Sequence, residues 1–116
     1  MIPTKWHPAL LDFSVDPLLS EEVDLQEAFE FITVIIPTLA GAYTTTVHIA
    51  MTPGGTYYPL HMFDTAAVGD FAQITDGATT AKVITFRIGG AQYVKVVSGT
   101  SLSADITFYV RGFNRG

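Results

Sequence analysis

The groups in this sequence that could do chemistry are few and widely spaced: three histidines, eleven carboxylates and no cysteine. His48 and His61 fall on neighbouring predicted strands, and with Asp64 they could ligate a metal ion. The simpler interpretation is that His48 is solvated on a strand face and that His61 packs beside Tyr57 or Tyr58. The absence of cysteine excludes disulfides and thiolate metal sites.

Two sets of carboxylates resemble known sites only loosely. Glu27 and Glu30 could flank a sugar as paired acids do in glycosidases, but a solvated acidic face is the simpler interpretation. Asp64, Asp70 and Asp76 could bind calcium, yet their spacing of six differs from the alternation of an EF-hand loop. Walker, GxGxxG, HExxH and GxSxG motifs are absent from the sequence. We therefore predict that the protein is not an enzyme and binds neither a metal nor another cofactor.

Aromatic side chains offer a further kind of binding chemistry, because their rings could form a platform for sugars. The candidates for this platform are Trp6, Tyr43, Tyr57, Tyr58, Tyr93 and Tyr109. In sheet proteins, tyrosines more often cap the core or lie at a sheet edge, with the hydroxyl reaching a polar partner. A carbohydrate-binding module is therefore an alternative, and it requires an exposed aromatic cluster.

Length and composition favour one small strand-rich domain with covered apolar surface. The chain has 116 residues, of which 48% are hydrophobic and only 15% are charged, against about 25% charged in an average domain. The positive mean hydropathy of +0.34 indicates that a partner covers some apolar surface. The net charge of −5 argues against nucleic acid as that partner. No segment approaches the roughly 20 apolar residues of a membrane helix, so no membrane partner is expected.

Charge is unevenly distributed along the chain. Residues 1–30 have a net charge of −6, whereas residues 80–116 have a net charge of +4. Complementary patches of this kind steer association and fix its register. Chance drift of charge along a short chain is the simpler alternative.

The elements that position these residues begin with an N-terminal segment, residues 1–20, that is predicted to be an extended arm. Its prolines break helices and favour extended backbone. The segment carries too many apolar side chains to remain in water, so it packs on its own domain or docks on a neighbouring subunit. The candidate partner-binding residues of the arm are Trp6, Leu10, Leu11 and Phe13.

The rest of the chain, residues 21–116, shows the period-two alternation of half-buried strands. In residues 44–52, Val47, Ile49 and Met51 fall on one face, and Ile106, Phe108 and Val110 are predicted to face inward. Pro59 cannot donate to a ladder, so its strand is predicted at a sheet edge. Strands are expected over residues 29–36, 44–52, 56–63, 71–74, 80–88, 91–97 and 104–111.

Two local features decide the predicted topology. Gly89-Gly90 lies between two alternating runs and fits the two-residue turn of a β-hairpin, with positive φ at both glycines. A helix over residues 20–31 is conceivable, although the β-branched residues after Phe31 favour a strand. The sequence therefore predicts an all-β fold: a single antiparallel β-sandwich or jelly-roll domain with an extended N-terminal arm.

Several short stretches, covering residues 21–112, follow the order of a known family. They are Glu22-Val23-Asp24-Leu25, Ile36-Pro37, Pro53-Gly54-Gly55-Thr56-Tyr57-Tyr58-Pro59-Leu60, Ala91-Gln92-Tyr93-Val94-Lys95-Val96-Val97-Ser98-Gly99-Thr100 and Ala104-Asp105-Ile106-Thr107-Phe108. This progression resembles the small β-sandwich virion proteins of tailed bacteriophages. Gln26, Pro53 and Val97 depart from the family pattern, which has glycine, aspartate and a polar residue at these places.

The resemblance implies a non-enzymatic virion structural protein. The expected role is a capsid decoration or cement protein that lies on the capsid surface, binds the major capsid protein and stabilises the shell. A homo-oligomer, with a trimer favoured, would bury the excess apolar surface. The alternative is a carbohydrate-binding, fibre or neck module of a phage particle.

Overall fold

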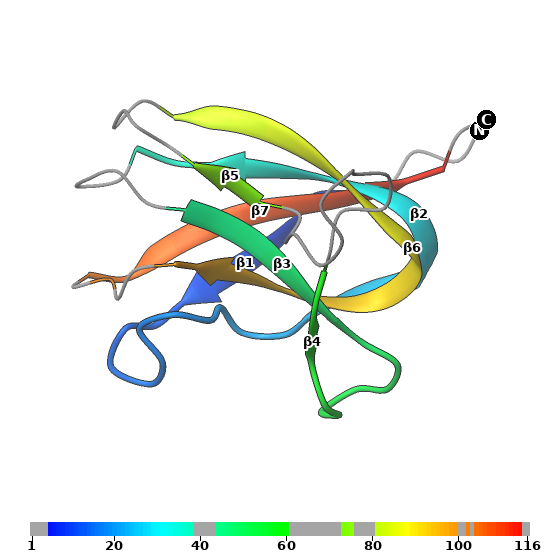
Figure 1. Cartoon of the computed structure of the whole chain (residues 1–116), viewed down its shortest axis with the longest axis horizontal. Coiled ribbons are helices and arrows are strands. Elements are labelled where there is room, and N and C mark those ends of the chain that lie inside the picture. The colour runs from blue at the N-terminus through cyan, green and yellow to red at the C-terminus, as the bar shows by residue number, and fades with distance from the viewer. Residues whose placement is uncertain are drawn as a thin grey trace, which may run out of the picture.

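The computed structural model describes residues 5–38, 44–60, 73–75, 81–99, 102 and 104–114. Its strands are β1 (His7–Leu11), β2 (Val23–Ile36), β3 (Thr44–Ala50), β4 (Tyr58–Pro59), β5 (Gln73–Thr75), β6 (Lys82–Ser98) and β7 (Ile106–Phe113). All pair antiparallel in one sheet in the order β1-β7-β2-β6-β3-β4, with β5 also paired to β3 (Figure 1). The all-β prediction is confirmed, whereas the sandwich or jelly roll is not. The helix considered over residues 20–31 is a strand from Val23 onward.

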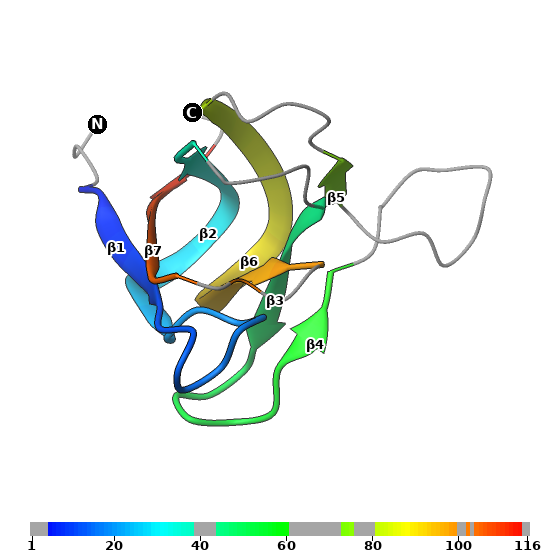
Figure 2. The ribbon, with the colours of Figure 1, turned by 90° about the vertical axis from the view of Figure 1, so that its left-hand side faces the viewer.

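The sheet curves because β2 and β6 are long and bend together. The first residues of β2 pair with the second half of β6, as Val23 does with Val94. The last residues of β2 pair with the first half of β6, as Ile36 does with Lys82. Between these regions the register shifts, and Gln26 in β2 has a positive φ of 72°. The sheet therefore folds over itself, with β1 and β7 on one side and β3 and β4 on the other (Figure 2).

The predicted hairpin at Gly89-Gly90 is wrong. Both glycines lie inside the continuous 17-residue strand β6, which pairs with β2 on both sides of them. The positive φ expected for the two residues is present, at 67° and 93°, but it bends a strand instead of reversing the chain. Glycine reaches positive φ without a Cβ clash in a turn or a bend alike.

The core fills the inside of the folded sheet. Val47 from β3, Val94 from β6, and Phe108 and Val110 from β7 are all completely buried. The inward orientation predicted for Phe108 and Val110 is confirmed, and Ile49 and Ile106 are partly buried against the same core. Met51, predicted on the face of Val47, is instead exposed because it lies beyond the end of β3.

The predicted extended arm is not confirmed, because its described residues form a strand of the sheet followed by a turn. Strand β1 pairs with β7 from His7 opposite Val110 to Leu11 opposite Ile106. The chain then turns back, and a β-bridge joins Leu19 to Val97. The completely buried side chains of the segment, Ala9 and Leu11, lie opposite residues of β7, a pairing that local sequence does not reveal.

Strand β4 ends the sheet, as predicted from Pro59. Among the described strands it pairs with β3 alone, through His48 opposite Pro59 and Ile49 opposite Tyr58. Residues 61–63 of the predicted strand lie outside the described residues. Across the described ranges, no helix has the length and apolar character to span a membrane.

Candidate functional site

Exposed apolar side chains mark the candidate binding surfaces. Within the described part of the chain, the large hydrophobic residues that are exposed fall into three groups. The groups are Trp6, Val83, Tyr109 and Phe113 on one sheet face, Phe13 and Val15 in the turn after β1, and Met51 and Tyr58 beside the bend of β6. Apolar side chains that gather on one surface are candidates for an interaction site.

The largest group belongs to a surface that we call the outer face, the outward side of β1, β7, the second half of β2 and the first half of β6. Its residues are Trp6, Pro8, Leu10, Phe31, Thr33, Ile35, Val83, Thr85, Arg87, Thr107, Tyr109, Arg111 and Phe113. Directly paired residues share one face of a sheet. One row across all four strands is Pro8, Tyr109, Ile35 and Val83, each paired with the next.

Aromatic contacts and cations give the outer face its chemical character. The rings of Phe31 and Phe113 stack with their centroids 5.2 Å apart. The Arg111 guanidinium lies over the Trp6 ring, 5.9 Å from its centroid. Arg87 makes an exposed ion pair with Glu30 at 3.8 Å, which contributes little to stability. The face is thus apolar and aromatic, with arginine charge among its rings.

The second surface is the 12–16 turn, the connection that follows β1. The backbone oxygen of Asp12 accepts hydrogen bonds from the N–H groups of Val15 and Asp16, both at 2.9 Å. Its Oδ1 accepts from the Ser14 hydroxyl at 2.6 Å and from the Ser14 N–H at 3.0 Å, and these bonds lower the pKa of Asp12. Phe13 N–H donates to Asp105 Oδ1 at 3.3 Å, just before β7. The turn is therefore held in one conformation while Val15 remains 81% exposed.

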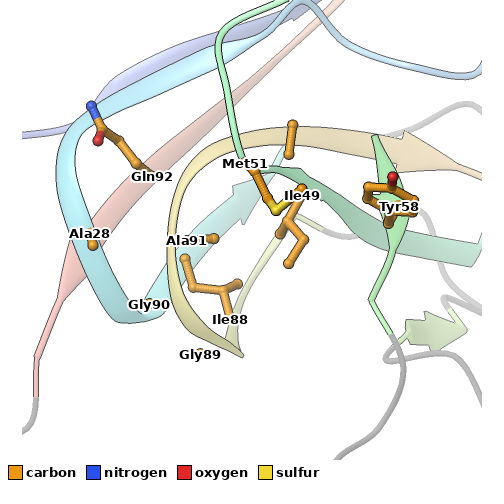
Figure 3. Close-up of a pocket in the computed structure, with 10 residues that line it drawn as sticks. Ala28, Ile49, Met51, Tyr58, Ile88, Gly89, Gly90, Ala91 and Gln92 are labelled. Carbon is orange, nitrogen blue, oxygen red and sulfur yellow. The ribbon is translucent and has the colours of Figure 1, made fainter. Parts of the chain in front are cut away.

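The third surface is a depression that we call the corner hollow, beside the bend of β6 (Figure 3). Its volume is about 420 Å³, and its lining residues are Ala28, Ile49, Ala50, Met51, Tyr58, Ile88, Gly89, Gly90, Ala91 and Gln92. Figure 3 shows the side chains of Ile49, Met51 and Ile88 gathered between the bend and Tyr58 of β4. The hollow forms because the Gly89-Gly90 bend carries β6 around the end of β3.

Polar contacts cover a different region, which we call the polar face: the outward side of β3 and the second half of β6. The Tyr57 hydroxyl donates to Glu22 Oε1 at 2.5 Å, and Gly54 N–H donates to the same oxygen at 2.9 Å. Lys95 Nζ lies 4.8 Å from the centroid of the Tyr57 ring. The hydrogen bond from Tyr57, followed by that from Gly54, lowers the pKa of Glu22. Burial, reinforced by the bond to Glu22, raises the pKa of Tyr57.

The structure separates the four predicted partner-binding residues. Leu11 is completely buried in the core, and Leu10 is partly buried beside β7. Trp6 is exposed on the outer face, whereas Phe13 is exposed on the 12–16 turn. The sequence prediction overlooked Val83, which is 63% exposed on the outer face. Its outward position follows from the period-two alternation around Phe86 and Ile88, the buried residues of the same strand.

The residues considered for metal and acid chemistry do not come together where the structure describes them. His48 lies on β3 opposite Lys95, and its pKa is lowered by burial and then by the lysine charge. The other metal and calcium candidates, His61, Asp64, Asp70 and Asp76, lie outside the described residues. Within the described ranges, no group of three histidine or carboxylate side chains could hold a metal ion. Glu27 is exposed, while Glu30 pairs with Arg87.

The candidate sugar platform is divided among several surfaces. Tyr57 lies beneath Lys95 on the polar face, and Tyr58 borders the corner hollow. Tyr109 lies on the outer face near Trp6, whose ring carries the Arg111 guanidinium. Tyr43 falls outside the described residues, and Tyr93 is partly buried on β6. The described rings therefore do not form one open stacking surface.

Comparison with known proteins gives one informative similarity. No protein-family model matches the chain, and no curated protein sequence matches it. The fold is similar to the crystal structure of the SPBc2 prophage-derived protein YomS, with a TM-score of 0.53 and 18% sequence identity. The match covers 97% of this chain and 97% of that protein. The chain therefore shares, across nearly its whole length, the fold of a small prophage-derived β protein.

Proposed function

We propose that this chain is a non-enzymatic structural protein of a phage particle, a capsid decoration or cement protein that binds the major capsid protein through the outer face. The observation that carries the proposal is the row of Pro8, Tyr109, Ile35 and Val83 across four strands, in which all but the half-buried Ile35 are exposed. The similarity in fold to a prophage-derived protein supports a phage origin.

The outer face has the properties that a docking surface needs. Burial of an apolar side chain such as Val83 or Tyr109 contributes about 1.5–3 kcal/mol, before the entropy cost of association is subtracted. The surrounding sheet is rigid, so few side chains must be ordered on binding. Arg87 and Arg111 suit a partner whose surface carries carboxylates around an apolar centre. Valine and isoleucine in the row favour a protein partner over a sugar.

The test is co-sedimentation of the purified protein with phage capsids that lack it. We expect wild type to sediment with the shells and Val83→Asp to bind at least ten-fold more weakly, because the carboxylate would be buried without a partner. Thr56→Asp is the matched control, since Thr56 is exposed in the β3–β4 connection and belongs to none of the three apolar surfaces. Circular dichroism and melting curves establish that both variants fold.

Two outcomes would contradict the proposal. One is undiminished binding of Val83→Asp to shells. The other is a wild-type protein that sediments with isolated tails or fibres but not with capsids, which would favour a neck or fibre component.

A further inference from the structure

Both end strands of the described sheet carry a proline. Pro8 lies in β1 and Pro59 lies in β4, the first and last strands of the order β1-β7-β2-β6-β3-β4 (Figure 2). We propose that these two prolines close the edges of β1 and β4 to a further strand, so that partners are recognised by side chains on the faces of the sheet. The proposal concerns the edges alone, so it goes beyond the attachment of the outer face to a shell and does not depend on it.

In β1, the proline lies where a backbone donor would point away from the sheet. The Leu10 carbonyl oxygen accepts a hydrogen bond from Glu21 N–H at 2.7 Å, and Glu21 lies outside β7. Backbone polar groups of an antiparallel strand point alternately toward and away from the neighbouring strand. Leu10 and Pro8 are two residues apart, so both turn their backbone groups away from β7. On that side the Leu10 carbonyl already has a partner, and Pro8 has no N–H to donate.

The same arrangement recurs in β4. Leu60 N–H donates to the Val47 carbonyl oxygen of β3 at 3.1 Å, so residue 60 turns its backbone groups toward β3. Pro59 is the preceding residue and lies opposite His48. By the same alternation, its nitrogen points away from β3. In both end strands, proline therefore occupies a position from which any other residue would donate a hydrogen bond outward.

Exposed apolar side chains beside both prolines make an open edge hazardous there. Pro8 is itself exposed and pairs with Tyr109, another exposed residue of the outer face. Pro59 follows Tyr58, which is exposed at the border of the corner hollow. An apolar edge strand with free backbone groups recruits strands from other molecules, and proline on an edge strand prevents this pairing. The apolar side chains can thus remain exposed without the sheet being extended from one copy to the next.

Replacing each proline restores one outward N–H and tests the proposal. Pro8→Thr and Pro59→Thr are compared with wild type by sedimentation and light scattering over a range of protein concentrations. We expect each variant to self-associate at least about ten-fold more strongly than wild type, because its edge can pair with the same edge of a second copy. Val83→Thr is the matched control, since it places a threonine on the outer face without adding a backbone donor. Melting curves establish that the three variants fold.

Amide hydrogen exchange identifies the contact as strand pairing. The N–H restored at position 8 or 59 should exchange slowly with solvent at high protein concentration and rapidly in dilute solution. A proline variant that associates no more strongly than wild type overturns the proposal for its edge, because the proline would then be merely tolerated there. Association that leaves the restored N–H unprotected, or that Val83→Thr matches, also overturns it, since side chains would then join the copies.

Discussion

The outer face and the polar face are outward sides of the same curved sheet, yet they differ in how far their side chains are covered by the rest of the chain. On the polar face, Lys95 of β6 lies over the Tyr57 ring and the Tyr57 hydroxyl donates to Glu22, so the connection from β3 to β4 contacts other parts of the chain there. On the outer face, Val83 and Tyr109 remain exposed. One face is covered by contacts within the chain, whereas the other keeps apolar side chains exposed.

The largest expected effect comes from the core that supports both faces. Phe108 is completely buried in β7. Phe108→Ala should lower the free energy of unfolding by about 3–5 kcal/mol, through lost transfer energy and the cavity that remains. Urea denaturation followed by tryptophan fluorescence measures the change. A loss below about 1 kcal/mol would mean that the two halves of the sheet do not share this core.

The bend between the two faces should show the next largest effect. Gly89 has a φ of 67°, which a β-branched residue rarely adopts. Gly89→Val should therefore cost about 1–3 kcal/mol, although an added Cβ would meet no atom within 4 Å. Thermal melting checks the loss, with Ala91→Val in the same strand as a comparison. An unchanged melting temperature for Gly89→Val would show that the bend does not require a positive φ at residue 89.

The hydrogen bond that covers the polar face should have a moderate effect that depends on pH. Tyr57→Phe removes the bond to Glu22 and should cost about 0.5–1.5 kcal/mol at neutral pH, toward the low end because Glu22 is exposed and screened. The pKa of Glu22 is lowered from its ordinary 4.5 in the folded protein, so its stabilising contribution is present above pH 4.5 and lost as the pH falls through the lowered value. Wild type and variant should therefore converge in acid. A difference that persists at pH 2 would assign the effect to packing of the ring.

The smallest expected effect is on the outer face itself. Val83→Thr keeps the shape and β-branching of an exposed strand residue, so the free energy of unfolding should change by no more than about 0.5 kcal/mol. Chemical denaturation provides the measurement. A loss comparable to that of Phe108→Ala would show that Val83 supports the fold, and the contrast between the two faces would disappear.

Period-two alternation predicted much of the fold because one side of each strand is buried. Phe108 and Val110 face inward as predicted, and Pro59 correctly placed its strand at an edge. The bend of β2 was not predictable in the same way, since positive φ at Gln26 is unusual for a residue with a side chain. There the Asp24 carboxylate accepts a hydrogen bond from Gln26 N–H at 2.7 Å. The sequence alone does not show that this contact accompanies a positive φ.

The candidate surfaces were only partly predictable. The excess of apolar residues drew attention to the N-terminal segment, where Trp6 and Phe13 are exposed, and their binding of a partner stays a prediction. The sequence could not show that Leu11 would be buried while Val83 stays exposed, because both outcomes depend on strand pairing. The corner hollow exists because β6 bends at Gly89-Gly90 without reversing its direction. A Gly-Gly pair fits a bend and a hairpin turn equally well, so the sequence does not distinguish the two.

The position of β7 between β1 and β2 has a consequence for the order of folding. His7 pairs with Val110, so the two strands meet across a very long loop of chain. Contacts this distant in sequence form slowly, because the entropy of closing the loop is lost before the contacts stabilise the product. On the ribosome, β1 must wait until Ile106–Phe113 have been synthesised and released. A chain cut short before β7 would therefore lack the strand that joins β1 to β2, and with it the centre of the outer face.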